Sequence, residues 1–207
     1  MSIEIEFSNL IKIYEEKSLY KNLSGKVKAG HCTCITGNNG SGKSTFLKII
    51  AGLSRPTSGS LLYYKEGGTL PLAKLREQIA FVSPEMQLYD ALTATENLLF
   101  FASMAANSAL AKELVPKALQ LVGLSSVADK KTATFSTGMK QRLKLAMLPA
   151  SDRSLWLLDE PSSNLDAAGR KIVEKLIEHA KKKEYTVLLA TNDPLEVAYA
   201  DTIFCLS

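Results

Sequence analysis

Residues 32–50 read CTCITGNNGSGKSTFLKII, and this stretch decides the fold. Residues 32–36 form a short run of cysteine and β-branched side chains, which predicts a buried strand. A helix is predicted over residues 46–52, with Gly52 ending it. Between the two lies a glycine-rich string, which comprises Gly37, Asn38, Asn39, Gly40, Ser41, Gly42, Lys43, Ser44 and Thr45. Strand, glycine loop and helix in this order indicate one βα unit of an α/β fold.

The glycine-rich string fits the phosphate-loop pattern, with four residues between Gly37 and Gly42 and with Lys43-Ser44 after them. Glycines let backbone N–H groups converge on one concavity, and the N-terminus of the following helix adds its positive dipole end. Lys43 is predicted to bridge the β- and γ-phosphates of a nucleotide, and the Ser44 hydroxyl to ligate Mg²⁺. A simple turn before a helix would explain the glycines but not Lys-Ser at this spacing.

A second apolar run, residues 155–158, ends in the adjacent carboxylates Asp159 and Glu160. A strand that is buried on both faces has no structural use for two acids at its end. Asp159 is predicted to hold Mg²⁺, directly or through water, and Glu160 to act as the general base toward an attacking water. The two motifs together predict ATP and Mg²⁺ as ligands and phosphoryl transfer to water as the reaction.

Length and composition bound the class of protein. The 207 residues are enough for one domain with a full core, predicted to span residues 1–207. Contents of 46% hydrophobic and 22% charged residues exclude collagenous, disulfide-stapled and disordered chains. The net charge of +4, with the two signs interspersed, does not indicate nucleic acid as a partner. No apolar run reaches the roughly 18 residues of a membrane span, and the N-terminus alternates apolar and acidic residues, so we expect a cytoplasmic location.

The rest of the chain alternates predicted strands with helices. An apolar stripe predicts a helix around residues 172–180, and the pattern as a whole indicates a parallel sheet covered on both faces. Further strands are expected at residues 3–7, 61–64, 79–82, 186–191 and 202–206. Residues 94–150 change to helical periodicity, so a helical subdomain of about residues 84–150 is predicted to interrupt the α/β core.

We predict that Cys32 and Cys34 are structural residues buried on one face of a strand, because they lie two residues apart in an apolar run. The lysines at 181–183 are interpreted as the solvated end of a helix, where cations favour the dipole.

The ordered set of motifs resembles the nucleotide-binding subunit of an ATP-binding cassette (ABC) transporter. The stretch Phe135-Ser136-Thr137-Gly138-Met139 is similar to the signature sequence of that family, and residues 159–166 are similar to its Walker B end and D-loop. Residues 92–98 resemble the opening of its helical subdomain. The resemblance runs from about residue 3 to residue 206. It implies an α/β P-loop NTPase core with a mostly parallel sheet, flanking helices, an N-terminal antiparallel β part and a helical insertion.

The resemblance also implies partners. Two cassettes, identical or different, would close head to tail on two ATP molecules, so that Ser136 and Gly138 of one cap the γ-phosphate held by Lys43 of the other. Tyr14 is the position that matches the adenine-stacking aromatic of the family, with Tyr20 as the alternative. A transmembrane permease subunit would carry the cargo, and the chain would lie peripherally at the cytoplasmic face of the membrane.

Two departures from the family pattern concern hydrolysis. Asn192 stands where the switch histidine is expected, and a neutral amide can hydrogen-bond a γ-phosphate but cannot exchange a proton. Glu85 stands near the expected glutamine, where it could reach Mg²⁺ but would repel a phosphate. We therefore expect measurable but slow ATPase activity.

Three functions remain open at this point. The compact length resembles exporter ATPases of heme-exporter and multidrug type, which favours an export subunit. A soluble ABC ATPase that acts on ribosomes or DNA is one alternative, although such proteins usually carry two cassettes or a long coiled-coil insertion. A degenerate cassette that binds ATP and regulates a partner is the other. The sequence does not indicate the cargo.

Overall fold

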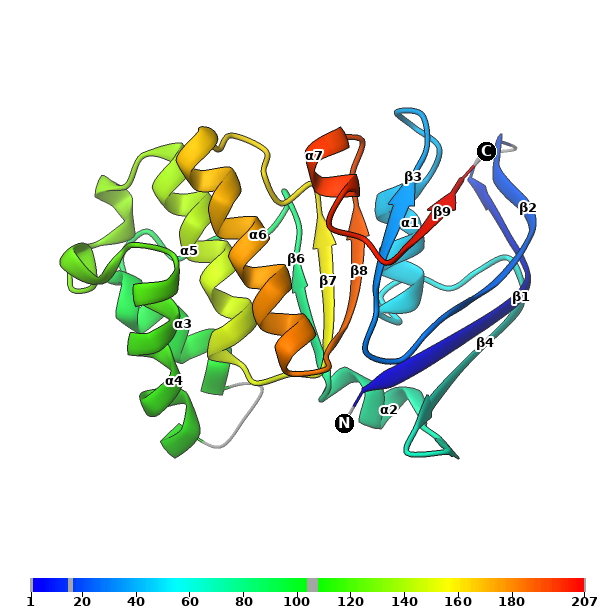
Figure 1. Ribbon diagram of the computed structural model, residues 1–207, viewed down its shortest axis with the longest axis horizontal. Coiled ribbons are helices and arrows are strands. Elements are labelled where there is room, and N and C mark those ends of the chain that lie inside the picture. The colour runs from blue at the N-terminus through cyan, green and yellow to red at the C-terminus, as the bar shows by residue number, and fades with distance from the viewer. Residues whose placement is uncertain (1, 15–16, 104–107, 207) are drawn as a thin grey trace.

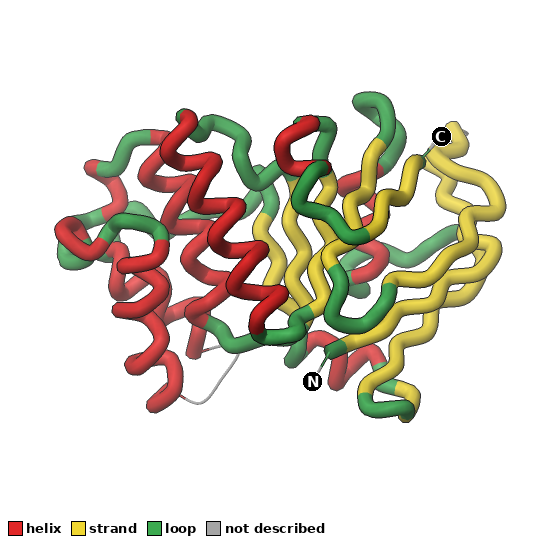
Figure 2. Tube along the Cα trace, in the orientation of Figure 1, coloured by secondary structure: helices red, strands yellow, loops and turns green. Residues whose placement is uncertain are grey.

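The computed structural model describes residues 2–14, 17–103 and 108–206. Figure 1 shows helices gathered at one end of the molecule, a parallel sheet in the middle and an antiparallel sheet at the other end. The tube in Figure 2 shows the same division between a helical end and a strand-rich end. The α/β fold that the sequence predicts, with a parallel sheet, an antiparallel part and a helical portion, is confirmed.

The central sheet has the order β6-β7-β8-β3-β9, and every neighbouring pair is parallel. Its strands span, in that order, Ile79–Val82, Leu155–Asp159, Thr186–Ala190, Cys32–Thr36 and Thr202–Cys205. Strand β7 is buried along its whole length: Trp156 and Leu158 enter the core on the helical side, and Leu155 and Leu157 enter the core on the opposite side. Burial on both faces explains why its sequence is continuously apolar up to Asp159.

The second sheet is antiparallel and has the order β2-β1-β4-β5. Its strands span Lys17–Val27, Ile3–Tyr14, Ser58–Lys65 and Gly68–Thr69. Strand β1 runs beyond the predicted residue 7 because Asn9, at φ +50°, forms an irregularity through which pairing with β2 continues. Strand β2 was not predicted. It lies at the edge of the sheet, so only one of its faces packs on the core. Most of its side chains are therefore polar.

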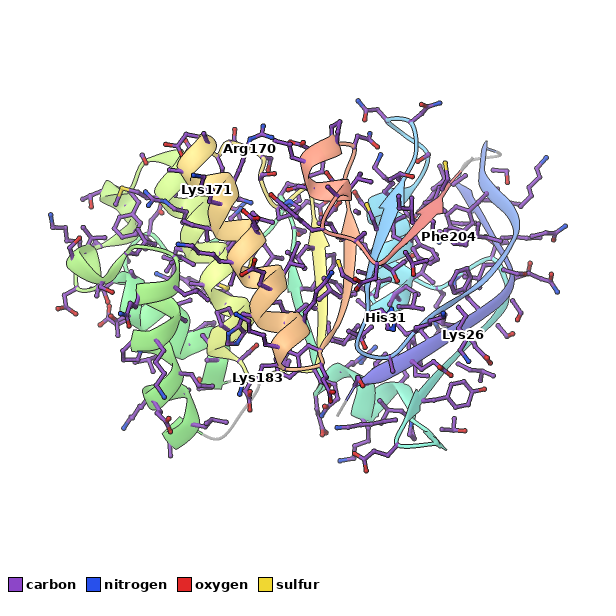
Figure 3. The ribbon with its side chains drawn as sticks, in the orientation of Figure 1. Lys26, His31, Arg170, Lys171, Lys183 and Phe204 are labelled. Carbon is purple, nitrogen blue, oxygen red and sulfur yellow. The ribbon has the colours of Figure 1, made fainter. Side chains whose placement is uncertain are left out.

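Helix α1, Lys43–Ile50, packs between the two sheets. Its Phe46 ring lies 5.2 Å from that of Phe7 on β1 and 6.4 Å from that of Phe204 on β9, which Figure 3 labels. The helix begins three residues earlier than predicted, because the end of the glycine loop forms its first turn. Its last residue is Ile50, two residues before the predicted end, and Gly52 at φ +68° turns the chain after it.

The helical end of the molecule covers the face of the parallel sheet that lies opposite α1. Helices α3, α4 and α5 lie between β6 and β7 in the chain, and α6 follows β7. These four helices span Ala94–Ser103, Ser108–Leu121, Thr137–Ala150 and Ala167–Lys182. The predicted stripe of α6 is buried against this core, in which Trp156 is fully buried. The limits of the inserted subdomain at residues 84 and 150 stay a prediction, and residues 104–107 within it lie outside the described part.

Short elements complete the chain. They are α2 and α7, which span Leu72–Arg76 and Pro194–Val197, and the 3₁₀ turns Ser125–Val127 and Thr132–Thr134. Among the helices of the described residues, none combines the length and the apolar character needed to cross a bilayer.

Cys32 and Cys34 are fully buried on β3, as predicted, and burial raises the pKa of each thiol to about 12. The lysine run lies at the end of α6, as predicted, and Lys181 also makes two specific contacts. Its ammonium group donates to the carbonyl oxygen of Tyr199 at 2.8 Å and to the Asp201 carboxylate at 2.7 Å, so it ties α6 to the approach to β9.

Candidate functional site

The glycine loop connects β3 to α1, and all three of its glycines have positive φ. Gly37 has φ +146°, and a Cβ atom there would lie 2.5 Å from the carbonyl oxygen of Leu206. Gly42 has φ +95° and immediately precedes the first helical residue of α1. Side chains rarely fit either conformation, which explains glycine at both positions. The loop leads straight into a helix N-terminus, where unpaired N–H groups and the dipole favour an anion.

Lys43 folds back over this loop and is buried, with 7% of its surface exposed. Its Nζ donates to the carbonyl oxygen of Gly37 at 2.7 Å and to that of Asn38 at 3.3 Å. No carboxylate of the described residues forms a salt bridge with Lys43. An unpaired ammonium group held by neutral carbonyls is therefore available to phosphate oxygens, which are stronger acceptors.

Asp159 and Glu160 lie at the carboxyl end of β7, between β6 and β8. Asp159 pairs with Ala190 of β8, and the Glu160 backbone N–H donates to the Ala190 carbonyl oxygen at 2.9 Å. Glu160 has φ +46°, a left-handed conformation that turns the chain sharply at the strand end. Asp159 is buried and Glu160 is exposed. The two neighbouring acids therefore face different surroundings.

Burial raises the pKa of the Asp159 carboxyl, while a hydrogen bond from the Ser44 hydroxyl lowers it and the Glu160 charge raises it further. Ser44 of the phosphate loop thus lies near the end of β7. An Mg²⁺ site at this pair stays a prediction. One hydroxyl and one carboxylate are oxygen donors of the kind Mg²⁺ uses when phosphates and water supply its other ligands. Among the described residues, no group of three or more His, Cys, Asp or Glu side chains is arranged to hold a metal ion.

Two adjoining clefts open at this edge of the sheet and share Asn39 and Glu160. The first has a volume of about 470 Å³ and is lined by Tyr14, Leu19, Asn39, Gly40, Gly42, Lys43, Ser44, Thr45 and Glu160. The second has a volume of about 200 Å³ and is lined by Asn39, Glu160, Ser162, Ser163, Arg170, Thr191, Asn192, Asp193 and Glu196. Glu160 thus stands between the phosphate loop and the segment that follows β8.

Asn192 lies on the far side of Glu160 from Lys43. Its Nδ2 donates to Oδ1 of Asn39 at 3.1 Å, which links the segment after β8 to the phosphate loop. The structure therefore brings Asn192 to the second cleft, where the resemblance expects a switch residue. The Ser41 hydroxyl in the phosphate loop is buried and has no hydrogen-bond partner among the described residues.

Tyr14 ends β1 at the first cleft and is half exposed. The Nζ atom of Lys12 lies 4.4 Å from the centre of its ring, so one face of the ring already carries a cation. Tyr20 is buried, and its ring lies beneath the loop, where a Cβ atom on Gly42 would come within 3.2 Å of it. The geometry favours Tyr14 over Tyr20 as an aromatic surface that a ligand could reach.

Glu85 lies in the loop after β6 and lines neither cleft. Both of its carboxylate oxygens accept from Lys48 of α1 at 2.9 Å. Lys48 lowers and Glu85 raises the pKa of Asp159, so the pair contributes to the field at the end of β7 without lining the first cleft. A metal-ligand role for Glu85 stays a prediction.

Ser136 and Gly138 begin helix α5 and line neither cleft. The Ser136 hydroxyl accepts from the backbone N–H of Met139 at 3.2 Å and caps the helix, and Gly138 lies in the first turn. Both therefore sit at an exposed helix N-terminus, and within one chain they do not meet Lys43. Their role toward a second cassette stays a prediction.

Three side chains that the sequence did not single out hold the residues after Glu160 and Asn192. Glu196 accepts from Ser162, Gln141 donates to the Pro161 carbonyl oxygen, and Arg170 pairs with Asp193. Figure 3 shows Arg170 near the end of α6 that faces α7. No sequence signal identifies these contacts, because each joins elements far apart in the chain.

The chain is similar to known proteins over most of its length. A protein-family model described as ABC transporter matches residues 20–163. The chain is 34% identical over 191 residues to the cytochrome c biogenesis ATP-binding export protein CcmA of Vibrio vulnificus, covering 92% of this chain and 93% of that protein. It is also 34% identical to the Nod factor export ATP-binding protein I of Burkholderia pseudomallei, covering 91% of this chain and 62% of that protein.

The fold is similar to that of a solved ATP-binding cassette, MJ0796, in a dimeric post-hydrolysis state bound to ADP and Pi. The TM-score is 0.83 and the sequences are 30% identical, over 98% of this chain and 94% of that one.

Proposed function

Because this chain belongs to the ABC transporter family and is an ATP-binding ATPase of that family, we propose that it hydrolyses ATP at the edge where β3, β7 and β8 end and thereby energises export through a separate membrane-embedded partner. The observation that carries the proposal is the cleft that Lys43, Ser44 and Glu160 line together, next to the strand end that Asp159 forms.

In this proposal the phosphates of ATP bind at the glycine loop. Lys43 exchanges its two carbonyl acceptors for oxygens of the β- and γ-phosphates, and the N-terminus of α1 stabilises their charge. Ser44 and Asp159 would hold Mg²⁺, which when bound supplies neutralisation of phosphate charge. Tyr14 is the surface on which the adenine would stack.

Glu160 is positioned to accept a proton from the attacking water, because it is exposed at the junction of the two clefts. Asn192 would donate its amide to the γ-phosphate in place of Asn39. An amide stabilises that oxygen without changing its own charge, so this step would not vary with pH near neutrality.

A second cassette and a transmembrane permease complete the proposed assembly. The exposed helix N-terminus at Ser136 and Gly138 has the chemistry to cap a γ-phosphate held by a second copy, identical or not. The similarity to a dimeric cassette supports this arrangement. The chain would work at the cytoplasmic face of the membrane as a peripheral subunit.

The direction of transport is proposed from the relatives. Two proteins that are each 34% identical to this chain over about nine-tenths of its length are export ATP-binding proteins. The permease would bind the cargo, because a nucleotide and its hydrolysis would use both clefts.

The test is phosphate release by the purified chain with ATP and Mg²⁺. We expect slow but measurable turnover, reduced about 100-fold or more by Glu160→Gln, with ATP affinity changed less than twofold. Glu178→Gln is the matched control, because Glu178 is exposed on α6 and the same chemical change there should leave the rate unaltered. Normal turnover by Glu160→Gln would overturn the assignment.

A further inference from the structure

Glu196 is a buried carboxylate, only 3% exposed, on the short helix α7. Among the described residues no lysine, arginine or histidine forms a salt bridge with it. A buried charge without a counter-ion needs hydrogen-bond donors in fixed positions. The donors around Glu196 therefore show which segment of the chain this carboxylate holds in place.

Both donors to Glu196 come from one residue. Its Oε1 accepts from the backbone N–H of Ser162 at 3.0 Å and also from the Ser162 hydroxyl. Ser162 lies two residues after Glu160 and is itself buried. If the segment moved away, both donors would be lost at once and the carboxylate would stay buried and unsatisfied, so this contact resists displacement.

The segment between these residues is a tight turn that carries Glu160. Glu160 has φ +46°, and its carbonyl oxygen accepts from the Ser163 N–H at 3.1 Å. On the other side of the turn, Gln141 of α5 donates from its buried amide to the Pro161 carbonyl oxygen at 2.8 Å. The turn is thus held from α7 through Ser162 and from α5 through Pro161.

Helix α7 is fixed in its turn to the candidate site. It begins at Pro194, two residues after Asn192. Its cap residue Asp193 accepts from the Leu195 N–H at 2.9 Å and pairs with Arg170 of α6. Glu196 lines the same 200 Å³ cleft as Glu160 and Asn192. One short helix therefore connects Asn192 with the turn that carries Glu160.

We infer that Glu196 is a positioning residue for ATP hydrolysis, which holds Glu160 in place through its two hydrogen bonds from Ser162, with Gln141 holding the opposite side of the same turn. The inference rests on the role proposed for Glu160. A general base must reach its water to within about 2.6–3.2 Å, so a shift of the turn by about 1 Å is enough to slow the reaction strongly. ATP binding does not depend on this distance, because Lys43 and the glycine loop lie on another segment.

The test compares kcat, KM and ATP affinity for Glu196→Ala, Glu196→Gln and Ser162→Ala, with Glu178→Ala on exposed α6 as control. We expect Glu196→Ala to lower kcat about 30-fold, with KM and ATP affinity within twofold of the parent. Glu196→Gln keeps an oxygen for both donors and should recover most of that loss. Ser162→Ala keeps the backbone donor, so it should lower kcat about threefold to tenfold.

Unchanged kcat in Glu196→Ala would overturn the inference. So would an equal loss in Glu196→Gln, which would assign the effect to charge, or a parallel loss of kcat, ATP affinity and thermal stability, which would assign it to folding. Glu160→Gln is measured alongside. If Glu160→Gln retains turnover, the proposed function fails; if it loses turnover while Glu196→Ala does not, only the inference on Glu196 fails.

Discussion

Asn192 donates to Asn39 beside Glu160, so a neutral amide joins the end of β8 to the phosphate loop. Neither amide titrates between pH 5 and 9, and neither can take up or release a proton. The chemistry at this position is therefore limited to hydrogen bonding.

Replacing Asn192 by histidine tests that limit. We expect Asn192→His to raise the hydrolysis rate about tenfold, because an imidazole can add charge and proton exchange at the γ-phosphate. The gain should be largest below a pKa near 6.5, where the ring is protonated, and should fall as the pH rises. Phosphate release is measured from pH 5.5 to 8.5 for both proteins. A rate that is the same in both at every pH would mean that residue 192 does not contact the reaction.

Lys48 and Glu85 form the second pair whose chemistry can be tested. Lys48→Met should lower the hydrolysis rate about fivefold, because it leaves the Glu85 carboxylate unpaired in the field of Asp159 and the phosphates. Adding Glu85→Gln removes that charge and should restore most of the rate. Steady-state ATPase rates of the two single variants and the double variant form the cycle. Additive losses would show that the two side chains act independently.

At the residue scale, the sequence predicted the residues of the candidate site better than the residues that hold them in place. Lys43, Ser44, Asp159 and Glu160 could be proposed because their chemistry depends on local spacing, and the structure places them at one edge. Glu196 and Gln141 could not be proposed. A buried glutamate that accepts from a serine 34 residues earlier has no local pattern, and its burial depends on how α7 packs.

At the scale of elements, the core strands and helices were predictable because burial on one or both faces fixes their periodicity. Strand β7 and helix α6 are examples, with continuous and 3.6-residue apolar patterns respectively. Strand β2 and helix α2 were missed for the opposite reason. Helix α2 is mostly exposed and β2 is an edge strand with few buried side chains, so tertiary pairing decides their conformation and the sequence pattern stays weak.

The loop between β3 and α1 gives an element-scale prediction. Gly42→Ala should weaken ATP binding about tenfold, because alanine at φ +95° is strained by about 1–2 kcal/mol and its Cβ would press on Tyr20. Gly68→Ala is the control, since its φ is not in the left-handed region and its nearest neighbour would be 3.7 Å away. Titration with a fluorescent ATP analogue measures both. Equal affinities for the two variants would contradict a phosphate site at this loop.

At the scale of the whole molecule, one cassette contains the phosphate loop and the signature helix, but the two line no common cleft. In the proposed assembly, a second copy or a related chain would bring the two together. We expect the Glu160→Gln variant to dimerise when ATP is added and to remain monomeric without it.

Gly138 offers a way to block that dimer without unfolding the chain. A Cβ atom there would meet its nearest neighbour at 3.5 Å, an ordinary contact. Gly138→Asp, combined with Glu160→Gln, should bind ATP but stay monomeric, because its carboxylate would repel the partner's γ-phosphate. Light scattering after size-exclusion chromatography measures the mass with and without ATP. An ATP-dependent dimer of the double variant would contradict the proposed role of the signature helix.

The most direct test of the central claim, that ATP is bound and cleaved where β3, β7 and β8 end, is the identity of the nucleotide that remains on the protein. Wild-type, Glu160→Gln and Lys43→Ala proteins are incubated with ATP and Mg²⁺, desalted and analysed for bound nucleotide. The account predicts ADP or no nucleotide on the wild type, intact ATP on Glu160→Gln and none on Lys43→Ala. Recovery of ADP from Glu160→Gln, or of ATP from Lys43→Ala at the occupancy found for Glu160→Gln, would contradict it.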